Sequence, residues 1–155
     1  SKIIFCLLTD PVYKKYFTPG EWKFLEEHIP WTRKLTLEDS GLLRRVLAEK
    51  DSLMLKPHNS YASRGHIVGR DSTQSEWEEN IKRLADTNYL VQEIIPAPEK
   101  EFITGDTVPG EMLKVNLACY VFNGKLAGFY TRVSPNVVIS TLWGGAEVPT
   151  LVSRR

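Results

Sequence analysis

An Asn-Gly dipeptide between two long segments of apolar and polar residues places the strongest constraint on how this chain folds. Asn123-Gly124 follows segment 111–122 and precedes segment 125–134. Asn and Gly readily adopt the positive φ angles of a two-residue turn, so the pattern predicts a tight antiparallel hairpin. The turn also predicts a register, because strand side chains alternate faces with a period of two. The expected pairs are Phe122 with Lys125, Val121 with Leu126, Cys119 with Gly128, Leu117 with Tyr130, and Val115 with Arg132.

That register gives Arg132 an unusual expected position. The remaining side chains of its face are mostly apolar: Leu117, Cys119, Val121, Leu126 and Tyr130. Burying an unpaired charge is costly, so an arginine there needs an anionic partner. A phosphate group and a carboxylate of this chain both meet that need, and the sequence leaves both open. Gly144-Gly145 further along permits close backbone approach or forms a simple turn.

Three amphipathic helices are expected upstream. Two of them begin with a Thr-x-x-Glu pattern, at Thr18 and at Thr73, in which the Thr and Glu side chains satisfy free N–H groups of the first turn. Pro30 ends the first of these helices, and the other is expected to end near Thr87-Asn88. The apolar stripes are Trp22, Leu25 and Ile29; Leu42, Leu43, Val46 and Leu47; and Trp77, Ile81, Leu84 and Ala85.

Short apolar runs predict further strands. Lys2 to Leu8 is expected to be a strand, and 53–56 and 67–68 are expected to form a hairpin around the polar loop 57–69. Tyr89 to Ile95 is either a strand buried on both faces or an edge strand with solvated Gln92 and Glu93. The fold class is therefore expected to be α+β. Segment 96–112 is the best candidate for a mobile seam between two parts of the chain. Three regions are expected in all: 1–52, 53–95 and 96–155.

Composition excludes several classes of protein. The 155 residues are enough for one core or two small lobes, and a formal net charge of +1 argues against nucleic acid or an anionic membrane as partner. The longest apolar run has six residues, against the roughly 20 that a membrane span needs, so a soluble, cytoplasmic protein is expected. Cys6 and Cys119 both lie in apolar stretches. Two buried free thiols are expected, in preference to one disulfide in a secreted protein.

Common catalytic motifs do not occur. There is no G-x-S-x-G, G-x-x-x-x-G-K-[ST], G-x-G-x-x-G, H-E-x-x-H or paired C-x-x-C pattern. His28, His58 and His66 do not show metal-binding spacing, so capping, packing or solvent roles are expected for them.

Two weaker signals point to a nucleotide. Lys56 ends a buried strand beside a loop with small residues and a later Gly69, where an ammonium and backbone N–H groups can meet phosphate oxygens. The alternative is a solvated hairpin tip. Segment 91–95 places polar side chains within a buried strand, where they can read an adenine edge.

Taken in order, the motifs resemble the ATP-grasp superfamily. They are Leu-Lys-Pro with a Tyr-x-x-x-Gly loop, Asp-Ser-Thr-x-x-x-Trp, Val-Gln-Glu, Ala-Gly-Phe-Tyr-Thr-Arg-Val-Ser and a later Gly-Gly. The segment Ile-Pro-Trp-Thr-Arg at 29–33 precedes them, as in the circularly permuted branch that includes glutathionylspermidine-synthase-like proteins. The resemblance spans roughly residues 20 to 150.

The resemblance implies ATP held between two α+β lobes and an ATP-dependent joining of a carboxylate, of a small molecule or peptide, to an amine or thiol through an acyl-phosphate. It assigns Lys56 and the glycine-rich loop to the phosphates, the strand end to adenine, and Arg132 to the transferred phosphate. The loop residues are Tyr61, Ser63, Arg64, Gly65 and His66; the adenine residues are Gln92, Glu93, Ile94 and Ile95; and Arg33 is a further phosphate contact.

One feature of the family pattern is missing. These ligases hold Mg²⁺ with an Asp and a Glu-x-Asn pair, but Glu147 is followed by Val148-Pro149, no Glu-x-Asn precedes residue 50, and Glu111 and Asn116 have the wrong spacing. The metal ligands are therefore expected outside this chain, in the remainder of a longer polypeptide. The alternative is a non-catalytic module of the same fold that contacts proteins and binds no nucleotide.

Overall fold

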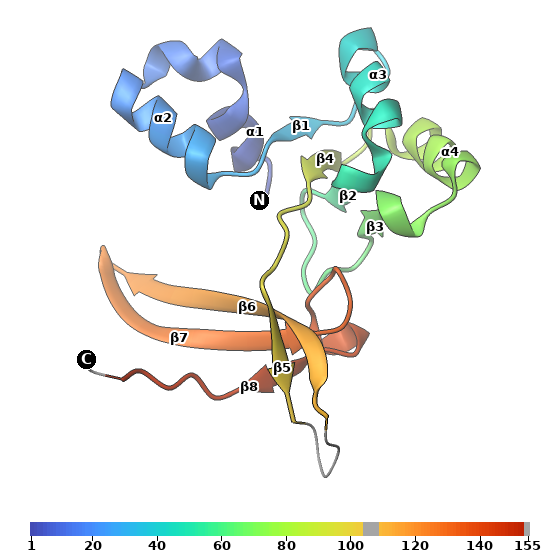
Figure 1. The fold of residues 1–155 in the computed structure, drawn as a ribbon. Coiled ribbons are helices and arrows are strands. Elements are labelled where there is room, and N and C mark those ends of the chain that lie inside the picture. Colours follow the sequence, from blue (N-terminus) through green and yellow to red (C-terminus); the bar gives the residue numbers. More distant parts are fainter. Residues whose placement is uncertain (104–108, 154–155) are drawn as a thin grey trace. The chain divides into compact units, whose positions relative to one another are not determined.

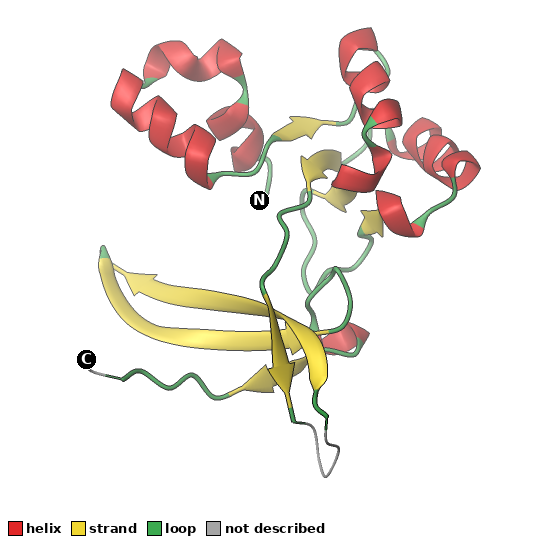
Figure 2. Ribbon diagram, viewed as in Figure 1, coloured by secondary structure: helices red, strands yellow, loops and turns green. Residues whose placement is uncertain are grey.

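Helices and strands fall into two compact units, residues 1–95 and 96–155, in a computed structural model that describes residues 1–103 and 109–153 (Figures 1 and 2). Each unit contains one four-stranded antiparallel sheet. The α-helices belong to the first unit. The expected α+β class is confirmed.

The sheet of the first unit has the order β1-β4-β2-β3. Its strands are β1 (Thr32–Lys34), β2 (Leu53–Pro57), β3 (Ile67–Val68) and β4 (Tyr89–Glu93). The expected hairpin of β2 and β3 is confirmed. Because β4 lies between β1 and β2 with Leu90 and Val91 both buried, the edge-strand alternative for this segment is wrong.

Helices α3 (Ser40–Ala48) and α4 (Gln74–Leu84) pack on one face of this sheet (Figure 1). The core joins Leu53, Leu55 and Val91 to Val46 and to the fully buried Trp77, whose indole N–H donates to Val46 O at 2.9 Å. The regions expected as 1–52 and 53–95 therefore share one hydrophobic core. By register, the other face carries Thr32, Met54, Lys56, Leu90 and Gln92.

The expected helix starts are confirmed. Helix α2 (Pro19–His28) begins with a complete capping box of Thr18 and Glu21, and α4 begins with one of Thr73 and Glu76. Helix α4 ends at Leu84, slightly before the expected end at 87–88.

The strand expected over Lys2 to Leu8 is wrong, because Ile4–Thr9 forms helix α1. A six-residue apolar run does not distinguish a strand from a buried helix by periodicity. The Thr9 hydroxyl donates to Thr32 O at 3.0 Å and accepts from Thr32 N at 3.2 Å. The Thr9 side chain thus hydrogen-bonds the backbone N–H and C=O of Thr32 at the edge of β1, where an additional strand would otherwise pair. The helix is followed by a 3₁₀ turn over Pro11–Tyr16.

The second sheet has the order β5-β6-β7-β8 and contains β5 (Glu99–Phe102), β6 (Glu111–Phe122), β7 (Lys125–Ser134) and β8 (Ala146–Val148). The expected hairpin is confirmed, with φ of 49° at Asn123 and 72° at Gly124. The boundary between the two units falls at 95/96, at the start of the segment predicted to be a mobile seam, and strand β5 lies within that segment. Residues 104–108 of the seam lie outside the described residues.

The expected hairpin register is correct only near the turn. Val121 pairs with Leu126, but an irregularity at 120–121 shifts the following pairs by one residue. Arg132 consequently pairs with Asn116 in place of Val115, and on its other side with Glu147. The apolar face predicted for Arg132 is therefore wrong, because a β-bulge exchanges the faces of the residues beyond it.

Both cysteines are free, but Cys6 is half-buried and Cys119 is exposed, so the prediction of two buried thiols is wrong. Cys119 lies between exposed Leu117 and Tyr120 in the hairpin. No helix within 1–103 and 109–153 has the length and apolarity needed to cross a membrane.

Candidate functional site

The candidate site of the first unit is a row of polar side chains on the sheet face opposite α3 and α4. The Lys56 ammonium donates to Gln92 Oε1 at 2.5 Å, and Gln92 Nε2 donates to Thr32 Oγ1 at 2.8 Å. The Thr32 hydroxyl donates to Pro30 O at 2.8 Å. Because β1, β4 and β2 are adjacent strands, the row crosses the sheet and orients the Gln92 carbonyl toward Lys56.

Lys56 is a largely desolvated cation. Burial, and then the nearby positive charge of Lys2, lower its pKa from 10.5 to about 8. Its hydrogen-bond acceptor is a neutral amide. Among the residues that the structure describes, no carboxylate lies within ion-pair distance of Lys56 or Lys2. An anion bound here would offset the cost of burying this charge.

His66 lies at the end of the loop that follows Lys56. Burial, then the charges of Lys56 and Lys2, lower its pKa from 6.5 to about 4, so the imidazole is neutral at pH 7. Its buried Nε2 has no hydrogen-bond partner among the described residues. The Nε2–H tautomer can donate to an anion without adding charge.

Lys2 is a residue of this cluster that sequence reasoning missed. Its ammonium donates to Ser60 O at 2.6 Å and to Pro57 O at 3.3 Å, and its backbone N–H donates to His58 O at 2.9 Å. These contacts join residues more than fifty positions apart. No local pattern around Lys2 indicates them.

The loop between β2 and β3 has a tightly specified backbone. Ala62 and Ser63 have positive φ angles of 52° and 56°, and Gly65 has 73°. A Cβ on Gly65 would lie 2.9 Å from the Tyr89 hydroxyl and 3.1 Å from Pro57 Cγ, and this crowding together with the positive φ favours glycine at the position. The Arg64 guanidinium stacks on the exposed ring of Tyr61 and donates to its hydroxyl at 3.2 Å.

Gly69 has a structural reason to be glycine. It is buried, and a Cβ there would lie 2.0 Å from Lys50 O. The close approach of the Lys50 carbonyl therefore accounts for glycine at this position, and no ligand is needed to explain it.

The residues predicted to hold adenine do not share one position. Gln92 is buried in the polar row, whereas Glu93 lies on the other face and accepts from Trp31 N at 2.9 Å. The Ile94 N–H donates to Ser52 O at 2.8 Å, and Ile95 is exposed.

Arg33 is not brought to Lys56, because its pairing with Val91 puts it on the other sheet face. Its guanidinium donates to Thr9 Oγ1 at 3.1 Å, lies 3.8 Å from the Asp10 carboxylate and stacks on Trp31. Burial lowers its pKa from the ordinary value. These contacts attach α1 to the sheet.

Arg132 lies among polar groups of the second unit. Its Nη2 donates to Asn116 Oδ1 at 3.1 Å, and its guanidinium carbon lies 5.4 Å from the centre of the Tyr130 ring. Its Nε is buried without a partner among the described residues. The Tyr130 hydroxyl donates to the Glu147 carboxylate, which raises the Tyr130 pKa. Arg132 forms no ion pair in the described ranges.

Replacing Arg132 with methionine is expected to change the melting temperature of the chain by less than about 3 °C. The variant loses one hydrogen bond, worth about 1 kcal/mol, and removes a partly desolvated charge that has no carboxylate partner. Thermal unfolding in the absence of ligand measures this. A drop of 10 °C or more would contradict the assignment, because it would reveal an internal ion pair.

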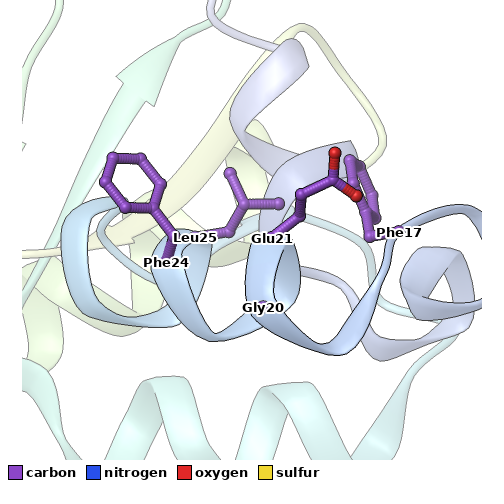
Figure 3. A pocket seen from close by; sticks show the side chains of 5 residues that line it. All are labelled: Phe17, Gly20, Glu21, Phe24 and Leu25. Carbon is purple, nitrogen blue, oxygen red and sulfur yellow. The ribbon is translucent and has the colours of Figure 1, made fainter.

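The lining of one surface hollow in the first unit includes none of the predicted site residues. The hollow has a volume of about 410 Å³ and is lined by Phe17, Gly20, Glu21, Phe24 and Leu25. Figure 3 shows Phe17 and Phe24 at opposite ends, with Leu25 and Glu21 between them. The Glu21 carboxylate already caps α2, so the remaining lining offers little to a phosphate.

No group of three or more His, Cys, Asp or Glu side chains within the described ranges is arranged to hold a metal ion. The described residues therefore offer Mg²⁺ no such cluster of ligands. Comparison with protein-family models finds no match to this chain, and comparison with curated proteins finds none either.

Proposed function

We propose that this chain is the ATP-binding portion of an ATP-grasp ligase that joins a carboxylate to an amine or thiol. In the proposed reaction, a carboxylate oxygen attacks the γ-phosphorus of ATP, the bond to ADP breaks, and an acyl-phosphate forms. The amine or thiol then attacks the acyl carbon, gives up its proton and displaces inorganic phosphate. The described residues supply binding and positioning for the first of these steps.

The observation that carries this proposal is the half-buried Lys56 ammonium, which has a neutral acceptor and no carboxylate partner in the described part of the chain. The uncharged His66 imidazole adds a hydrogen-bond donor. In the proposal these groups contact phosphate oxygens and Gln92 orients Lys56. The resemblance assigns Arg132, in the second unit, to the transferred phosphate.

The affinity for a non-hydrolysable ATP analogue is expected to fall roughly tenfold between pH 7.5 and pH 9. Phosphate is fully ionised in this range, whereas Lys56, with a pKa of about 8, loses the proton that phosphate binding requires. The charged group that bears on it is Lys2, and His66 is neutral throughout. Isothermal titration calorimetry at both pH values measures the change.

The matched control is Lys56→Arg, because a guanidinium stays charged across this range. If the variant binds the analogue, its affinity should be nearly independent of pH. An equal pH dependence in both proteins would show that another group is responsible and would contradict the role of Lys56.

A second candidate function, a protein-contact module that binds no nucleotide, is favoured by the exposed apolar residues of the β6–β7 hairpin. These are Leu117, Tyr120, Val121, Phe122, Leu126 and Phe129. Absence of saturable nucleotide binding would select this function.

A further inference from the structure

The contacts of Lys2 are more extensive than attachment of a chain segment requires. Its backbone N–H already joins the segment to the loop through His58 O. The half-buried side chain adds two hydrogen bonds from its ammonium to carbonyl oxygens of the loop. A hydroxyl or amide would satisfy those carbonyls without bringing a charge into a half-buried position.

That position puts like charges near one another. The Lys2 ammonium donates to the carbonyl oxygens of Pro57, the residue after Lys56, and of Ser60, in the loop that ends at His66. Its positive charge also lowers the pKa of both Lys56 and His66. In the described residues neither ammonium has an ion-pair partner. Two partly desolvated cations repel, and an anion between them removes this repulsion.

We propose that Lys2 supplies a second ammonium to the phosphate site at Lys56, so that the site takes a di- or polyphosphate group. This inference deepens the proposed function and rests on it. A single phosphate presents its charge at one centre, whereas a diphosphate distributes it over two. Two ammonium groups beside one neutral donor, His66, match the two charged centres of a diphosphate.

Titration with inorganic pyrophosphate tests this proposal without the rest of the nucleotide. The Lys2→Gln variant keeps a donor for the loop carbonyls and loses the charge, so about tenfold weaker binding is expected. The Lys2→Arg variant keeps the charge and is expected to bind within about threefold of the wild type. Lys82→Gln removes one charge from the exposed surface of α4, on the helix-covered side of the sheet, and is expected to change nothing.

A second readout separates charge from structure. In the pyrophosphate-free protein, Lys2→Gln is expected to raise the pKa of Lys56, measured by NMR at its Cε, because a repelling charge has been removed. A purely structural role for Lys2 does not predict this combination of weaker binding and a higher Lys56 pKa.

The possible failures are distinguishable. Wild-type affinity in Lys2→Gln, or equal losses in Lys2→Gln and Lys2→Arg, would overturn the role of the Lys2 charge. If Lys2→Gln and Lys56→Met both bind pyrophosphate with wild-type affinity, the proposed function is contradicted together with the inference about Lys2. If Lys56→Met alone loses binding, the proposed function stands and only the inference about Lys2 is wrong.

Discussion

Replacing Lys56 with methionine is expected to abolish nucleotide binding while making the ligand-free protein more stable at pH 7. Methionine keeps most of the packing volume of lysine and removes a desolvated charge. The lowered pKa of Lys56 corresponds to a cost of about 3 kcal/mol for keeping it charged in the fold. Loss of the hydrogen bond to Gln92 costs about 1–2 kcal/mol. A net gain of about 1–2 kcal/mol remains, measurable by urea unfolding.

The pH dependence provides a control for this prediction. Below pH 8, Lys56 is charged in both the folded and the unfolded state, so the cost of its burial is fully present. Between pH 8 and 10.5 the unfolded state binds more protons, and the wild type therefore gains stability relative to the variant. The stability advantage of Lys56→Met should vanish by about pH 10.5. A variant that is less stable than the wild type at pH 7 would show that Lys56 serves the fold.

The Gly69→Ala substitution is expected to lower the stability of the first unit by about 3 kcal/mol or more, with a fall in melting temperature of at least about 10 °C. The added Cβ would lie 2.0 Å from Lys50 O and 2.9 Å from Leu53 O. Both contacts are backbone atoms, and Leu53 begins β2, so relief requires moving the strand that carries Lys56. Calorimetric unfolding measures the loss.

Gly20→Ala is the matched control, because nothing lies within 4 Å of its added Cβ and it is within α2. It should be neutral or stabilising by up to about 1 kcal/mol. If Gly69→Ala melts like Gly20→Ala, the backbone near Gly69 can shift freely, and glycine there needs another explanation, such as a ligand.

Elements specified by neighbouring residues could be predicted from the sequence. The two capping boxes, the stripes of α3 and α4 and the turn at 123–124 each depend on residues within a few positions of one another. The β2–β3 hairpin and the interior position of β4 were also accessible, because continuous apolar runs indicate burial on both faces.

Features set by distant contacts could not be predicted. The bulge at 120–121 changes the partner of Arg132, and no residue near the turn indicates that a bulge forms there. Strands β1 and β8 have three residues each, too few for a periodic signal. Helix α1 is attached to β1 by the hydrogen bonds between Thr9 and Thr32, which the local sequence pattern does not indicate.

The same distinction holds for the candidate site. The sequence points to Lys56 and His66 because they flank a recognisable loop, and to Gln92 because a polar residue interrupts a buried strand. Lys2 was missed because its partners lie more than fifty residues away. Arg33 was expected to contact phosphate, but strand alternation places it on the opposite face from Lys56.

The most direct test of the central claim is an NMR titration of the uniformly ¹⁵N-labelled chain with ADP at pH 7. We predict saturable shifts of backbone amides that are largest at Lys56, in loop 61–66 and at Gln92. They should disappear in Lys56→Met, whose spectrum otherwise resembles that of the wild type. Shifts centred on the hollow at Phe17 and Phe24, or no saturable shifts at millimolar ADP, would contradict the assignment of a nucleotide site at Lys56.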